Sequence, residues 1–129
     1  MLLSAPEENL LCSADDSYPD QHVLVHELGH SVVDLAVRKA DSGFWGRVEK
    51  AYADARGGGR WVGYYGGSSA VEYWAEGAQA YFDASHAGSG PDPYGSPVGS
   101  RAELAAYDPQ LFALVRDVFT DNPWRPTCP

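Results

Sequence analysis

The stretch "EYWAEGAQAYF", residues 72–82, decides how this chain folds. Aromatic and alanine side chains occupy nearly every side of a helix built from it, and a helix that is apolar almost all round is expected to be buried. We therefore predict a buried helix over 70–84. Ser68 or Ser69 precedes it and can cap its first turn.

Two acids interrupt this apolar helix. Glu72 and Glu76 are four residues apart, so they share one face of the helix. The simplest interpretation is a solvated carboxylate face. Buried carboxylates, however, need a metal ion or another partner. We expect at least one of the two acids to be functional.

The sequence on both sides predicts a mainly α fold with about five helices and little strand. Residues 1–19 read as an irregular lead-in, and Asp20 can cap a helix that runs to residue 40. A second helix can start at Asp41 or Ser42, and three glycines, 57–59, end it.

The second half of the chain alternates loops with capped helices. "RWVGYYGGSS", from Arg60, predicts a short extended piece and a turn. The C-terminal helices are expected within 100–120. Ser100 with Glu103 forms a capping box, and Asp108 before a proline marks the last helix start.

Length and charge narrow the class of protein. The chain has 129 residues, which predicts one domain over 1–129. Eighteen acids against nine bases give a net charge of −9, so we expect neither nucleic acid nor an anionic membrane as partner. No apolar run approaches a membrane span, and the start "MLLSAPEENLL" does not resemble a signal peptide. The oligomeric state stays open.

Two cysteines, Cys12 and Cys128, lie near opposite ends of the chain. An oxidising compartment would permit a bridge between them, and two unrelated thiols are the alternative. Their spacing matches no metal-binding cysteine motif. The compartment stays open, with a secreted or extracytoplasmic location favoured.

The stretch "HVLVHELGH", residues 22–30, contains the pattern H-E-x-x-H. On a helix, His26 and His30 share one face and can grip one zinc ion. Zinc lowers the pKa of a bound water toward ~7, and Glu27 can take the water's proton as general base. The alternative is a chance match on a core helix, and His22, one turn earlier, is expected to be a bystander.

A third ligand has to come from elsewhere in the chain. A histidine at position 36 would continue a known three-histidine pattern, but that position is alanine. The two acids of the 70–84 helix remain. One can bind the metal and the other can accept the N–H of a zinc-bound histidine.

The stretch "YYGGSSAVEYWAE", residues 64–76, resembles the gluzincin zinc metallopeptidases, including the protease domain of anthrax lethal factor. The resemblance implies that Glu72 is the third zinc ligand and Glu76 the acid behind a histidine. It also implies that Tyr65 stabilises the oxyanion, as a phenol donor can. The neighbouring Tyr64 is the less suitable candidate, because its spacing to Glu72 is one residue too long.

A wider resemblance joins "PEENLLC", "LVHELGH", "EYWAEGAQAYFD", "RAELAAYDPQL" and the closing "WR". These are similar to uncharacterised zinc peptidases of bacteria and fungi, which implies a zincin-like catalytic domain. Gluzincins usually carry a sheet ahead of the zinc helix, and its edge strand holds the substrate. About 20 residues precede the helix here, so we expect a minimal sheet or the loss of most of it.

These expectations combine into a zinc-dependent peptidase that cuts peptides or proteins internally. One zinc ion would be held by His26, His30 and Glu72. The alternatives are a zinc-stabilised binding or regulatory module, or a trimmed and inactive peptidase domain, in which Glu27 is idle. A helical domain without metal is a further alternative.

Overall fold

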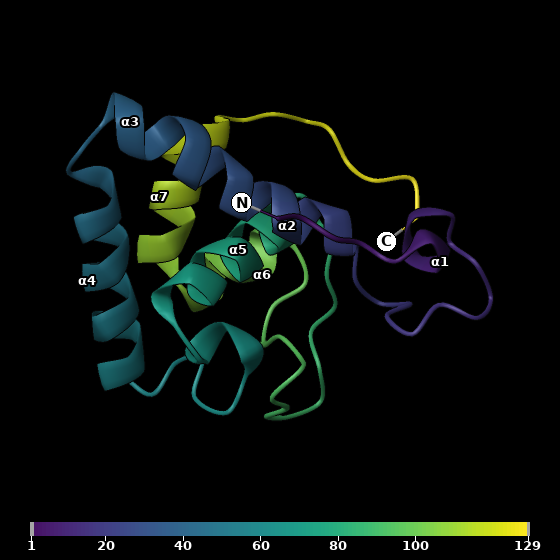
Figure 1. Ribbon diagram of the computed structural model, residues 1–129. Helices are drawn as coiled ribbons and strands as arrows, with labels where there is room; N and C mark the ends of the chain where they lie inside the picture. The colour runs from purple at the N-terminus through teal and green to yellow at the C-terminus, as the bar shows by residue number, and fades with distance from the viewer. Residues whose placement is uncertain (1, 129) are drawn as a thin grey trace.

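The computed structural model describes residues 2–128 and is mainly helical, as the sequence predicts (Figure 1). Within these residues the β pairing is limited to an isolated bridge between Ala87 and Ser96. No helix in this range combines the length and apolar character needed to cross a bilayer. The elements are α1 (Glu7–Leu10), α2 (Val23–Val32), the π-helical turn η1 (Val33–Val37), α3 (Arg38–Ala40), α4 (Phe44–Gly57), the 3₁₀ turn η2 (Tyr65–Gly67), α5 (Ala70–Tyr81), α6 (Arg101–Tyr107) and α7 (Pro109–Phe119).

Helix α5 is the centre of the molecule. Every residue from Tyr73 to Tyr81 is buried, and α2, α4, α6 and α7 all pack against this helix (Figure 1). The helix ends at Tyr81, three residues before its predicted end. The chain turns there, because Asp83 adopts a positive φ of 53° that a right-handed helix does not contain. The periodicity of the sequence therefore predicted the buried helix correctly, but the predicted C-terminal end lies three residues too late.

Two glycines let the neighbouring helices approach α5 closely. A Cβ atom at Gly29 of α2 would lie 3.0 Å from the Ala78 Cβ, and one at Gly77 of α5 would lie 2.6 Å from Leu111 of α7. The Trp74 indole N–H also donates to the Gly29 carbonyl over 2.9 Å. The absence of a side chain at Gly29 therefore allows α2 to pack closely against α5.

The helix that carries the H-E-x-x-H motif starts later than predicted. It begins at Val23 instead of Asp20, and then continues through η1 and α3 to Ala40, as expected. The assignment of Asp20 as its cap is wrong. The Val23 N–H donates instead to the side-chain Oδ1 of Asn9 over 2.8 Å. A side chain 14 residues away therefore caps α2, which local sequence patterns do not reveal.

Three other predicted caps are present in the structure. Ser69 accepts a hydrogen bond from the Glu72 N–H over 3.2 Å at the start of α5. Ser100 accepts from the Glu103 N–H over 3.2 Å at the start of α6. Asp108 accepts from the Leu111 N–H over 3.0 Å at the start of α7. These caps satisfy backbone donors that the first helical turn leaves free.

The start of α4 and the segment after it differ from the prediction. Gly43 is the residue before α4 and offers no side-chain cap, while Asp41 accepts the Gly43 N–H over 3.0 Å. Residues 60–69 form turns and η2 and contain no extended strand. Trp61 is fully buried within these turns, so the segment follows the packing of this ring instead of pairing as a strand.

The lead-in is more ordered than predicted. It contains the short helix α1, and Cys12 forms a disulfide with Cys128, with their Cα atoms 6.0 Å apart. The alternative of two unrelated thiols is therefore wrong. Figure 1 shows the yellow C-terminal tail passing over the helices to end beside α1. The disulfide joins the two ends of the described chain across the molecule.

Candidate metal centre

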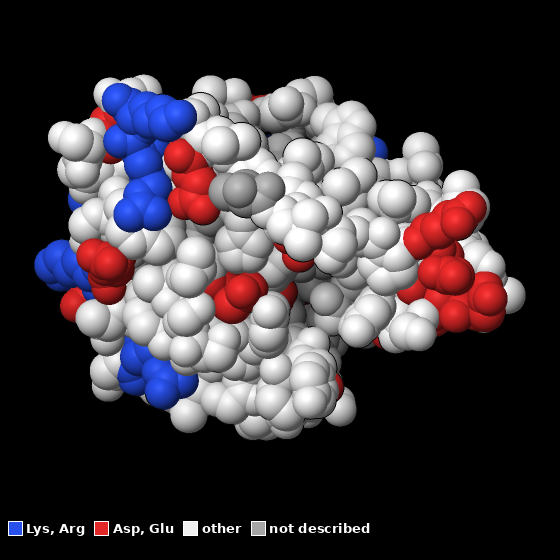
Figure 2. Space-filling model, viewed as in Figure 1, with Lys and Arg blue, Asp and Glu red and all other residues white. Residues whose placement is uncertain are grey.

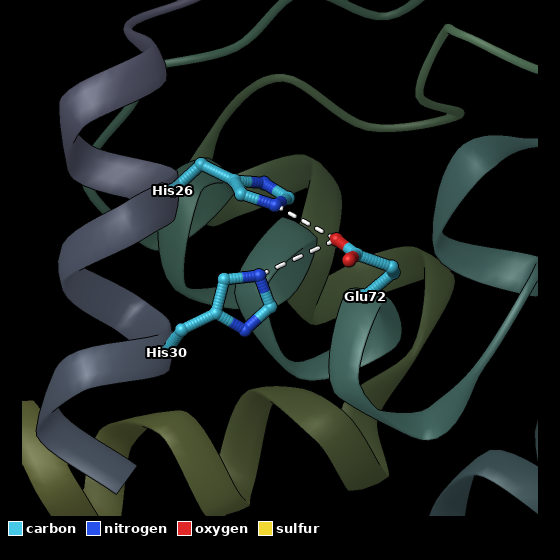
Figure 3. A group of neighbouring side chains, drawn as sticks. All are labelled: His26, His30 and Glu72. Atoms are coloured by element: carbon cyan, nitrogen blue, oxygen red, sulfur yellow. Dashed lines mark hydrogen bonds and ion pairs between the residues drawn. The ribbon is translucent and has the colours of Figure 1, made fainter. Parts of the chain in front are cut away.

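Side chains from two helices converge at the contact between α2 and α5. His26 and His30 project from α2 toward Glu72 of α5 (Figure 3). The Glu72 Oε2 atom lies 2.9 Å from His26 Nε2 and 3.4 Å from His30 Nε2. One candidate ligand atom from each residue lies within 4.8 Å of the others.

This geometry suits a small divalent metal ion. Metal–ligand distances of about 2.0–2.2 Å in a tetrahedral site place neighbouring ligand atoms roughly 3.3–3.5 Å apart. The two distances from the Glu72 oxygen are close to that spacing. Two neutral imidazole nitrogens and one carboxylate oxygen are also common metal donors. The group of His26, His30 and Glu72 could therefore hold a metal ion, after small side-chain adjustments.

His26 is buried and held from behind by α5. Its Nδ1 atom lies 3.0 Å from Glu76 Oε1 and 3.3 Å from Gln79 Oε1. Both neighbours are acceptors, so Nδ1 carries the hydrogen and Nε2 faces Glu72. The Glu76 side chain is only 2% exposed, which fixes the carboxylate in place. This is the arrangement in which a carboxylate orients a metal-binding histidine.

Without a metal ion, a proton balances the charges of this cluster. Burial alone would lower the pKa of His26, but hydrogen bonds and the charges of Glu72 and Glu76 reverse the shift and raise it to about 10. Burial would raise the pKa of Glu72, but His26 and His30 lower it to about 2. The site therefore stabilises positive charge between two carboxylates, whether a proton or a cation carries it.

Gln79 is a site residue that the sequence analysis missed. It is fully buried, and its Nε2 donates to the Ala84 carbonyl over 2.9 Å while its Oε1 faces His26. The spacing of 72, 76 and 79 places all three polar side chains on one face of α5. That spacing was a signal in the sequence that could have identified Gln79.

Glu27 and Tyr65 line a cleft beside the three converging residues. The cleft has a volume of about 420 Å³, and His26 and Glu76 also form part of its lining. Glu27 follows His26 on α2 and is partly exposed. His22 lies outside the converging group.

Tyr65 lies at the start of η2 and faces the histidines. Its ring centroid is 5.9 Å from that of His26, and its N–H donates to the Gly95 carbonyl over 3.1 Å. Burial and the nearby Glu72 raise the pKa of Tyr65 to about 12. The hydroxyl therefore keeps its proton near neutral pH and can donate a hydrogen bond into the cleft.

The turn behind Tyr65 is closely packed. A Cβ atom at Gly66 would lie 2.7 Å from the ring of Trp61, so any larger residue would displace the turn. The Gly67 carbonyl accepts hydrogen bonds from the Tyr52 hydroxyl over 2.8 Å and from Arg56 over 2.9 Å. These contacts with α4 fix the backbone that presents Tyr65.

The far wall of the cleft comes from the N-terminal part of the chain. Ser4, Pro6, Tyr18 and Gln21 line it, together with Tyr94 from the loop after α5. The sequence predicts an irregular lead-in over 1–19 and gives no sign that it lines a cleft. It lacks a strand, but it forms one side of the same cleft that contains Glu27.

Comparisons of the chain with protein families, with curated proteins and with solved structures found no match.

Proposed function

We propose that this protein is a zinc-dependent peptidase that hydrolyses internal peptide bonds. The observation that carries the proposal is the convergence of His26, His30 and Glu72 beside a cleft lined by Glu27 and Tyr65. A chance H-E-x-x-H match would not require an acid from another helix to meet both histidines. The finer assignments, a zincin-like fold and the gluzincin group, belong to this same proposal.

Zinc is the metal that the donor set favours. Two histidines and one glutamate form a common ligand set of catalytic zinc sites, and three protein ligands leave a fourth position open. Bound zinc would supply a positive charge that polarises a carbonyl group and lowers the pKa of water toward about 7. Glu76 would orient His26 for this role through the contact at Nδ1.

The side chains in the cleft provide the proton transfers. The Glu27 carboxylate would accept a proton from the attacking water and return it to the leaving nitrogen. The Tyr65 hydroxyl would donate a hydrogen bond to the carbonyl oxygen as negative charge develops there. Both groups line the same cleft as His26, as this division of roles requires.

Metal binding is tested first, on the purified protein. We expect one zinc ion per chain by elemental analysis, and a melting temperature that falls when a chelator removes it, because binding to the folded state stabilises that state. The His30→Ala variant should lose the zinc. The His22→Ala variant should retain it, because His22 lies outside the group of His26, His30 and Glu72. Absence of zinc in the wild type after its addition would refute both metal-based functions.

Activity is tested with zinc-loaded protein and a mixed peptide library. We expect cleavage that Glu27→Gln reduces by about 10²–10⁴-fold, the usual contribution of a general base, without loss of zinc. Glu49→Gln, an exposed acid on α4, is the matched control and should leave cleavage unchanged. Stoichiometric zinc without any cleavage would favour the non-catalytic binding module over the peptidase.

A further inference from the structure

Part of the cleft lining comes from an N-terminal segment without regular strand structure. Residues 4–21, here called the wall segment, contribute Ser4, Pro6, Tyr18 and Gln21 to the lining. Most of this segment is exposed to solvent, and it contains only the four-residue helix α1. Because this segment has few core contacts, it needs specific hydrogen bonds or covalent links to keep one conformation.

The buried side chain of Asn9 makes several of these hydrogen bonds. Asn9 is 3% exposed. Its Nδ2 lies 3.0 Å from the Tyr18 carbonyl and 2.6 Å from the Gln21 carbonyl, and also 2.9 Å from Asp16 Oδ2, so its two N–H bonds are shared among three acceptors. The Asn9 amide thus holds the backbone carbonyls of Tyr18 and Gln21, which are two of the four lining residues of the wall segment.

The same side chain joins the wall segment to the helix that carries the metal ligands. Asn9 Oδ1 accepts the Val23 N–H at the first residue of α2, three residues before His26. Asn9 thereby sets where the wall stands relative to α2. No contact of Asn9 reaches His26, His30 or Glu72, so its influence on the metal group is indirect.

A disulfide and a hydrogen bond also connect the wall segment to other parts of the chain. The disulfide between Cys12 and Cys128 ties the wall segment to the C-terminal tail. The Gln21 side-chain amide donates to the Tyr94 carbonyl over 3.3 Å, which joins the wall segment to the loop on the other side. The wall segment is thus attached to α2, to the C-terminal tail and to the loop that carries Tyr94.

We propose that the wall segment is the substrate-binding wall of this cleft and that Asn9 is its positioning residue. The inference rests on the proposed peptidase function. The occupant is an extended peptide, because the wall segment lines the same cleft as Glu27 and Tyr65 and contributes the tyrosine ring of Tyr18 and the polar side chain of Gln21 to it. The wall segment thereby replaces the strand edge that would otherwise align a peptide.

The structure allows the positioning role to be separated from helix capping. Asn9→Asp keeps an oxygen that can accept the Val23 N–H, but it removes the donors that hold Tyr18 and Gln21. The variant therefore loosens the wall while the start of α2 retains its cap. Tyr18→Ala removes a lining ring that is 48% exposed, so it should not disturb the core.

The test uses the full chain, loaded with zinc, and a peptide that the wild type cleaves. We expect Asn9→Asp and Tyr18→Ala each to raise KM by about tenfold, with kcat within about twofold and the zinc content unchanged, because ground-state binding is lost while the chemistry is retained. The double variant Cys12→Ser/Cys128→Ser should raise KM in the same direction. Leu11→Ala is the control, since Leu11 belongs to the same segment and is 67% exposed but lies outside the cleft lining.

The possible outcomes separate this inference from the proposed function. If the wild type cleaves no peptide, both the peptidase function and the substrate-binding role of the wall segment are refuted. If the wild type is active and the variants leave KM unchanged, only the role of the wall is refuted. Loss of zinc in Asn9→Asp would refute its positioning role in favour of a structural one. If Asn9→Asp fails to fold, Tyr18→Ala and the double cysteine variant decide the matter.

Discussion

His26 is the residue in which the packing of the protein and the chemistry of the site meet. One ring nitrogen faces Glu76 and Gln79 on the buried side, and the other faces Glu72 beside the cleft. The buried side fixes the ring orientation, and the open side presents a lone pair when the proton leaves. Glu72 and Glu76 on either side of the ring favour positive charge at His26.

The first prediction concerns the pH dependence of zinc binding. Burial would lower the pKa of His26, but the hydrogen bonds and charges of Glu72 and Glu76 raise it to about 10 in the metal-free protein. Zinc must therefore displace a proton, so its apparent affinity should rise at least about tenfold per pH unit between pH 7 and 8. The pKa of Glu72, lowered to about 2, contributes no slope in this range.

Calorimetry in buffers of different ionisation enthalpy measures the protons released. We expect more than one proton per zinc ion at pH 7.5: one from His26, and a further fraction from the zinc-bound water, whose pKa zinc would lower toward about 7. An affinity that is independent of pH, without proton release, would show that His26 does not exchange its proton for the metal.

The second prediction separates two adjacent tyrosines. Tyr65 lines the cleft and Tyr64 does not, although the two are neighbours in the sequence. Tyr65→Phe should lower kcat by about 10²–10³-fold, the usual effect of losing one oxyanion donor, with little change in zinc content. Tyr64→Phe should leave kcat within about twofold. Equal losses in the two variants would contradict the assignment of Tyr65.

At the scale of elements, the relation of α2 to α5 creates the site. Gly29 lets α2 approach α5 closely, since a Cβ atom there would lie 3.0 Å from the Ala78 Cβ. His26 and His30 of α2 meet Glu72 of α5 across this contact between the helices. The periodicity of the sequence predicted both helices and their buried faces, but not the side of α5 against which α2 lies.

The third prediction compares two helical glycines. A Cβ atom at Gly77 would lie 2.6 Å from Leu111, which is fully buried, whereas one at Gly46 of α4 would meet nothing within 4 Å. Gly77→Ala should destabilise the fold by about 1–3 kcal/mol through overpacking. Gly46→Ala should stabilise it by about 0.5–1 kcal/mol through helix propensity.

Denaturant titration of the metal-free proteins measures both effects. The opposite signs are the informative result, because both substitutions add the same methyl group to a helix. If Gly77→Ala were as stable as Gly46→Ala, α7 would not pack against α5 as closely as the structure indicates.

Helix ends show which boundaries can be predicted. Ser69, Ser100 and Asp108 sit next to the turns that they cap, so local sequence identified them. The start of α2 depends on Asn9, 14 residues earlier, and that contact exists only after the chain has folded. The predicted boundary at Asp20 failed for this reason.

The whole molecule is electrostatically uneven. Figure 2 shows Asp and Glu side chains gathered on the lobe that holds α1, while Lys and Arg lie mainly on the opposite side, over α3 and α4. Residues 1–20 contain five acids and no lysine or arginine, and the chain carries a net charge of −9. The lining of the cleft likewise contains no lysine or arginine. A cationic substrate approaching from this side would be attracted.

The fourth prediction follows from this charge distribution and rests on the proposed function. Of two peptides that differ only in a lysine or a glutamate beside the cleaved bond, the lysine peptide should have the higher kcat/KM, by about tenfold at low salt. Raising the salt concentration to 0.5 M should narrow the difference, since ions screen exposed charges. A glutamine peptide is the control and should respond little to salt. A preference for glutamate would contradict the prediction.

The sequence by itself determined the mainly helical class, the buried helix over most of 70–84, the caps that are local in the chain, and the residues that could bind a metal. Those features depend on periodicity and on contacts within a few residues. Only the tertiary structure decided that Glu72 meets both histidines, that Gln79 contacts His26 and that Asn9 caps α2. It also decided that Cys12 and Cys128 are joined and that the lead-in lines part of the cleft. These features depend on contacts between residues far apart in the chain, which the packing of α2 on α5 and the folding of both ends bring together.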